Sequence, residues 1–131
     1  MKTGLVYTNI SLRNPREDEL QPLQVQALVD TGSMLLCIPE YVAMQLKLAT
    51  LEEREVTLAD GSPKLCAYVG PIELRFGNRG SYAGALVLGD QVLLGAIVME
   101  DLDLVISPLT RSVEVNPRSP NIPSTIVKAH A

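Results

Sequence analysis

The chain has little of several residue types: no tryptophan, one phenylalanine, one histidine and two cysteines among 131 residues. With so few aromatic residues, aliphatic side chains must fill the core, and a hydrophobic content of 47% is enough for a single domain that buries one. The only histidine, His130, lies near the C-terminus. It therefore gives little support to a zinc site, or to a serine or cysteine hydrolase that needs a nearby base.

Positive charge is also scarce, and it is not clustered. The 11 Lys and Arg residues are outnumbered by 15 Asp and Glu residues, which gives a net charge of −4 and argues against nucleic acid as the main partner. No hydrophobic run approaches the length of a membrane span, and residues 1–10 contain no apolar core of a signal peptide. We therefore expect no membrane partner.

The two cysteines, Cys37 and Cys66, follow no secretory signal. In such a chain they are expected to be buried thiols in a reducing compartment, which predicts a cytoplasmic protein. A disulfide between them is the alternative.

Local patterns predict a protein built mostly of short strands. Alternation and turn residues favour strands at 4–12, 23–29, 55–58, 64–69, 71–76, 82–88, 92–95, 104–106 and 112–115, and short helices at 39–46 and 98–102. Asp60-Gly61 between two such runs is a strong hairpin signal. After Asn116 the composition shifts to proline and serine, so the sequence predicts a domain at 1–116 followed by an extended, flexible tail at 117–131.

The most informative stretch is Ala27–Ser33, an apolar run that ends on Asp30-Thr31-Gly32-Ser33. A buried strand that delivers an aspartate into a tight turn places the carboxylate where burial and neighbours control its protonation. The hydroxyls of Thr31 and Ser33 can hydrogen-bond to it, and Gly32 allows a sharp turn and a close approach of other backbone. The same tripeptide is also an ordinary way to end a strand, because Asp, Gly and Ser are common turn residues.

In context this stretch resembles the catalytic loop of the retropepsin-like aspartic proteases, specifically their small bacterial single-lobe members. The resemblance continues in Ala59-Asp60-Gly61-Ser62 at the place of a flap turn, and in Val92–Ala96 before a short helix; it covers about Gly4 to Asn116. It departs from the retroviral pattern after Gly95, where Ala96 and Ile97 replace a polar pair. The resemblance implies an all-β fold, a single-lobe acid-protease closed β-barrel with one or two short helices, assembled as a homodimer.

The resemblance also implies roles for individual residues. Asp30 would activate water, Thr31 would hydrogen-bond to the partner's loop, Gly32 would hold the turn and Ser33 would hydrogen-bond to Asp30. Ala59, Asp60, Gly61 and Ser62 would form a flap that contacts an extended peptide substrate. From the residues alone, Asp60 is better explained as a turn residue than as a catalyst.

The chain contains one Asp-Thr-Gly, whereas aspartic proteases use two carboxylates that share a proton. The resemblance therefore implies an aspartic endopeptidase in which Asp30 of two identical chains forms the site, so that it is active as a homodimer. The alternative is a peptide-binding or dimerisation module that hydrolyses little or nothing.

A second group of acids, Glu100, Asp101 and Asp103, is better explained as a solvated helix face than as a cation site, because it lacks the ligand spacing of a calcium loop. We expect neither a metal nor a cofactor.

Overall fold

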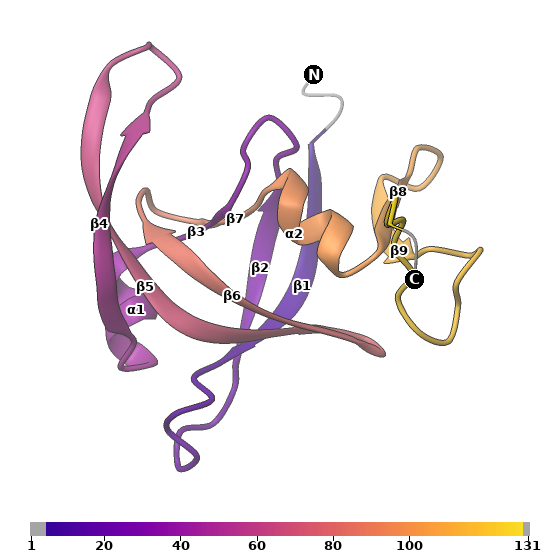
Figure 1. The fold of residues 1–131 in the computed structure, drawn as a ribbon, viewed down its shortest axis with the longest axis horizontal. Helices are drawn as coiled ribbons and strands as arrows, with labels where there is room; N and C mark the ends of the chain where they lie inside the picture. The colour runs from indigo at the N-terminus through magenta and orange to yellow at the C-terminus, as the bar shows by residue number, and fades with distance from the viewer. Residues whose placement is uncertain (1–4, 130–131) are drawn as a thin grey trace.

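The computed structural model describes residues 5–129 and is mostly β-strand (Figure 1). Six strands form a closed barrel, because the fifth strand in sequence pairs back to the first and leaves no gap in the sheet. Around the barrel the order is β1 (Val6–Arg13), β2 (Leu23–Val29), β7 (Val92–Leu94), β3 (Leu36–Ile38), β6 (Arg79–Val87) and β5 (Pro63–Phe76). The expected all-β closed barrel is confirmed.

Two short helices complete the fold: α1 (Glu40–Gln45) and α2 (Ala96–Asp101), each of six residues. Helix α2 begins directly after Gly95, two residues before the predicted start at residue 98. Among the described residues, no helix has the length and apolar character needed to cross a bilayer.

Aliphatic side chains fill the core, as the scarcity of aromatic residues predicts. Leu12, Leu36, Ile72 and Leu94 are fully buried, whereas the single phenylalanine, Phe76, is only half-buried. A smaller cluster of Cys37, Cys66 and Leu86 lies between the barrel and the β4–β5 hairpin, and both cysteines are free thiols.

The strands around the predicted flap are longer than expected. Strand β4 (Ala49–Thr57) starts six residues before the predicted residue 55, because an exposed, charged edge strand has no alternating apolar signal. The runs predicted as separate strands at 64–69 and 71–76 form one strand, β5, with an irregularity between Val69 and Ile72. Beyond this irregularity β5 leaves β4 and pairs with β1, which closes the barrel.

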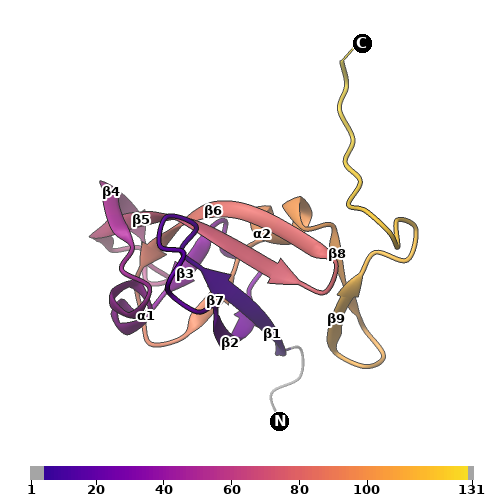
Figure 2. The same ribbon diagram turned by 90° about the horizontal axis from the view of Figure 1, so that it is seen from below.

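The C-terminal part begins with a hairpin beside the barrel, formed by β8 (Leu104–Ser107) and β9 (Ser112–Val115). After β9 the chain turns and then extends away from the barrel (Figure 2). The structure attaches the first part of this segment to the hairpin through Asp103. Its carboxylate accepts hydrogen bonds from Asn116 Nδ2 (3.0 Å), from the Ser119 hydroxyl and from the Ser124 N–H (2.8 Å).

Asp103 also faces a buried cation. Arg79 is fully buried at the start of β6, and its Nη2 donates a hydrogen bond to the Ser119 carbonyl and lies 3.8 Å from Asp103 Oδ2. Its Nε and Nη1 have no hydrogen-bond partner among residues 5–129. The Asp103 carboxylate and the Ser119 carbonyl are therefore the groups that compensate this guanidinium.

We expect Asp103→Asn to lower the midpoint of thermal unfolding by about 5 °C or more, because it removes the negative charge beside a buried arginine. Trypsin should also cut after Arg118 faster than in the parent protein. Asp90→Asn, at an exposed turn, is the control and should change neither value. Equal effects of the two substitutions would contradict this role of Asp103.

The same network predicts a dependence on pH. Hydrogen bonds from Ser119, Asn116 and Ser124 lower the pKa of Asp103 from 3.8 to about 2. An acid whose pKa is lower in the folded state stabilises the fold above its unfolded pKa, and this contribution is lost as the pH falls through the folded value. Between pH ~4 and ~2, the unfolding midpoint should therefore fall more steeply in the parent protein than in Asp103→Asn.

Candidate active site

Asp30 is the first residue after β2, at the end of a parallel pair in the barrel wall. Residues 27–29 of β2 align with residues 92–94 of β7, and the N–H of Asp30 continues the ladder by donating to the carbonyl of Leu94 (2.9 Å). Ala27 and Val29 are buried, whereas Asp30 is half-buried. The apolar run therefore forms a half-exposed strand that becomes buried as it reaches Asp30, as its alternation predicts.

Both oxygens of the Asp30 carboxylate are held by residues of its own loop. Oδ1 accepts a hydrogen bond from the N–H of Gly32 (3.0 Å), and Oδ2 accepts one from the Ser33 hydroxyl (3.0 Å). A β-carbon on residue 32 would lie 3.2 Å from Oδ1, so glycine leaves the carboxylate room. The expected hydrogen bond from Ser33 to Asp30 is confirmed. Thr31 is exposed on the same turn.

The loop is fastened to the first turn of α2. The N–H groups of Ala96 and Ile97 donate to the carbonyls of Ser33 (2.8 Å) and Met34 (3.1 Å). Gly95 makes this approach possible, because a β-carbon there would lie 2.5 Å from the carbonyl carbon of Met34. Ala96 and Ile97 stand where the retroviral pattern has a polar pair. At these two positions backbone hydrogen bonds hold the loop.

The predicted flap residues Ala59, Asp60, Gly61 and Ser62 form the turn between β4 and β5. Asp60 is a turn residue: its Oδ1 accepts hydrogen bonds from the Ser62 hydroxyl (2.6 Å) and the Ser62 N–H (2.9 Å). These bonds lower the pKa of Asp60, the hydroxyl having the larger effect. Gly61 has a φ of +86°, which favours glycine.

An open hollow of about 320 Å³ lies beside the Asp30 loop. Its lining includes residues 32–35 of the loop and Val56 and Thr57 of β4. Cys37, Leu86 and Leu88 complete its largely apolar lining. The structure thus brings the loop together with the base of the β4–β5 hairpin, whereas the turn at 59–62 does not line this hollow.

Sequence reasoning missed the residues of this hollow outside the loop. Val56 and Leu86 belong to strands distant in sequence, and an aliphatic residue in a strand has no local signal that separates a pocket wall from a core. Burial raises the pKa of the Cys37 thiol, and the nearby Cys66 and Asp30 act in the same direction. Cys37 is therefore a neutral wall residue and not a thiolate nucleophile.

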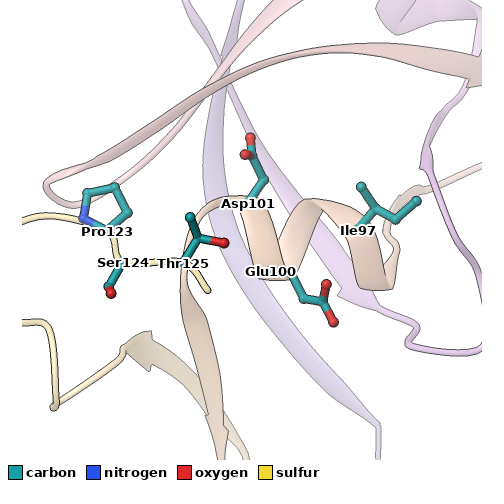
Figure 3. A pocket seen from close by; sticks show the side chains of 6 residues that line it. All are labelled: Ile97, Glu100, Asp101, Pro123, Ser124 and Thr125. Carbon is teal, nitrogen blue, oxygen red and sulfur yellow. The ribbon is translucent and has the colours of Figure 1, made fainter. Parts of the chain in front are cut away.

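A larger hollow, of about 430 Å³, lies between α2 and the C-terminal segment (Figure 3). Its lining includes Glu100 and Asp101, which point in different directions from the helix. Asp101 accepts a hydrogen bond from the Ser81 hydroxyl, and Asp103 is bound by the C-terminal segment. Within residues 5–129, no group of three or more His, Cys, Asp or Glu side chains is placed to hold a metal ion.

Compared with known proteins, the chain matches no family model and no curated protein.

We expect Gly95→Ala to lower the free energy of unfolding by about 3 kcal/mol, because the new methyl group would meet backbone atoms of Met34 and Leu35. Urea unfolding measures the change. Gly80→Ala is the control: its methyl group would meet the end of the flexible Arg75 side chain, which can move aside. Equal stability of the two variants would show that the loop does not depend on this contact.

Proposed function

We propose that this protein is an aspartic endopeptidase of the retropepsin-like type that acts as a homodimer. The observation that carries the proposal is the Asp30 carboxylate, which is held through both oxygens at the buried end of β2, in a loop whose next residues line an apolar hollow. A positioned acid next to a site that accepts an apolar side chain is what peptide hydrolysis by activated water requires.

The proposal requires two copies of the chain, because each contributes one such carboxylate. Closed two-fold pairing brings identical loops together and makes one site from two halves. The exposed Thr31 of each loop is then available to hydrogen-bond across the axis.

The chemistry follows that of the known carboxylate pairs, in which one acid is ionised and the other protonated. Ionised Asp30 takes a proton from water while the oxygen attacks the peptide carbonyl, and Asp30 of the partner subunit donates its proton to the carbonyl oxygen. The tetrahedral intermediate then collapses: the C–N bond breaks as Asp30 gives its proton to the leaving nitrogen, while Asp30 of the partner subunit takes a proton from a hydroxyl of the intermediate. A new acid and a new amine are released, and the carboxylate pair returns to its starting state.

An extended peptide is the substrate that the surroundings favour. Within residues 5–129, β4 is paired on one side only, with β5, so its other edge can hydrogen-bond to a strand-like chain. The hollow between β4 and the loop accepts an aliphatic side chain next to the bond that is cut. Two free, buried thiols support the proposal that the protein works in the reducing cytoplasm.

The test is cleavage of a mixed peptide library from acidic to neutral pH, with the mass in solution measured by sedimentation equilibrium. We expect the parent protein to be a dimer that cuts, and Asp30→Asn to be a dimer whose kcat/KM is lower by about 10²–10⁴-fold. Asp90→Asn is the matched control and should cut normally. A dimeric parent protein that binds peptides without cutting them would favour the peptide-binding module instead.

A mixing experiment tests whether the two carboxylates share one site. When Asp30→Asn is added in excess to a fixed amount of the parent protein and the subunits exchange, most parent chains enter mixed dimers that hold one Asp30. Activity should then fall toward zero. Unchanged activity under conditions where exchange is demonstrated would overturn the shared site.

A further inference from the structure

Strands β6, β5 and β4 are neighbours in the sheet (Figure 1). Residues on these three strands form a stack of a glycine, an aromatic ring and a guanidinium group. Tyr68 of β5 lies over Gly84 of β6 so closely that a β-carbon on residue 84 would be 2.2 Å from Cζ of the ring. On β4, the guanidinium carbon of Arg54 lies 3.8 Å from the ring centroid of Tyr68. A cation held over a ring at this distance is attracted by the ring's π-electrons, so the position of Arg54 is fixed in advance of any ligand.

The register of the hairpin places Arg54 on the side of the Asp30 hollow. Arg54 is opposite Cys66, which is buried against Cys37 and Leu86 in the small cluster that borders the hollow. Val56, a wall residue of the hollow, is two positions further along the same strand and therefore on the same face. Tyr68, opposite Glu52, packs against the same cluster.

The charges of β4 are divided between its two faces. Glu53 and Glu55 alternate with Arg54 and therefore point to the opposite face. On the face of the hairpin that borders the hollow lie Arg54 and Glu52 of β4, together with Lys64 of β5.

Arg54 uses only part of its hydrogen-bonding capacity within residues 5–129. Its Nε donates to Glu52 Oε2 at 2.7 Å, and this is the hydrogen bond that its side chain makes within residues 5–129. The guanidinium carries five N–H donors in a planar fork, so its two terminal nitrogens can still bind a carboxylate. The side chain is 40% exposed, which makes these nitrogens accessible.

We propose that Arg54 binds an acidic side chain of the peptide, and that the preferred ligands are extended peptides with Asp or Glu two positions from the residue that fills the hollow. The spacing follows from the strand: Val56 and Arg54 are about 7 Å apart along β4, the same distance that separates side chains two apart in an extended peptide. This inference rests on the proposed function for its choice of site, but it concerns binding and not hydrolysis.

Binding to Asp30→Asn tests the proposal without any need for cleavage. The probes are fluorescein-labelled octapeptides of alanine with one central leucine and with Glu, Gln or Lys placed two residues before or after it. We expect one of the two Glu peptides to bind about tenfold more tightly than its Gln counterpart, and the Lys peptide to bind most weakly, as measured by fluorescence anisotropy.

Further substitutions in the Asp30→Asn background test whether Arg54 causes the preference for Glu peptides. Arg54→Gln should abolish the difference in affinity between the Glu and Gln peptides. Tyr68→Leu should reduce this difference, because the guanidinium group loses the aromatic ring against which it packs. Arg75→Gln, at an exposed position on the part of β5 that pairs with β1, is the charge-matched control and should retain the preference. Circular dichroism confirms that each variant is folded.

The outcomes separate this inference from the proposed function. Equal binding of Glu and Gln peptides, a preference for Lys, no binding of any peptide, or a Glu preference that survives Arg54→Gln would each overturn the role of Arg54. Glu-selective binding that depends on Arg54, together with no hydrolysis by the parent protein, would support this inference and refute the protease.

Discussion

The candidate site depends on the close contact between the Asp30 loop and the start of α2. Gly95 has no side chain, so its backbone packs directly against the backbone of Met34 and Leu35, and the next two N–H groups bind the carbonyls of Ser33 and Met34. The loop is thereby fixed at its C-terminal end, while the ladder bond from Asp30 to Leu94 fixes its N-terminal end. Because both anchors are backbone groups, the side chains of Asp30, Gly32 and Ser33 are left to organise the carboxylate. A side-chain network is not needed to hold the loop in place.

A second constraint is the number of acids. Asp30 is a half-buried carboxylate that accepts hydrogen bonds from two donors. The carboxylate of Asp60 is instead hydrogen-bonded within its own turn, and that of Asp103 is hydrogen-bonded to the C-terminal segment. The candidate site therefore has one carboxylate per chain, and the proposed chemistry needs two. This is why the assembly state is part of the proposed mechanism. The Thr31 hydroxyl is exposed in a single chain. In the proposed dimer it would hydrogen-bond to the loop of the partner subunit.

Strand β5 has two structural roles. Strand β5 pairs with β4 in its first half, where it supports the candidate flap, and with β1 in its second half, where it closes the barrel. Strand β4 is left at the edge, and its charged residues alternate between the outer face and the side of the hollow. Closure of the barrel and support of the candidate flap therefore depend on the same strand, β5.

The sequence by itself determined the local features. The run from Ala27 to Ser33 predicted a buried strand ending on Asp30, Asp60-Gly61 predicted the hairpin turn, and the scarcity of aromatic residues predicted an aliphatic core. These features depend on residues that are neighbours in the chain, so propensity and alternation are sufficient to indicate them. Only the tertiary structure decided which distant residues meet: Val56 and Leu86 around the hollow, Tyr68 beneath Arg54, and Ser124 on Asp103. The pairing partner of a strand and the register of that pairing set these contacts, and neither is encoded in the local pattern of a single strand.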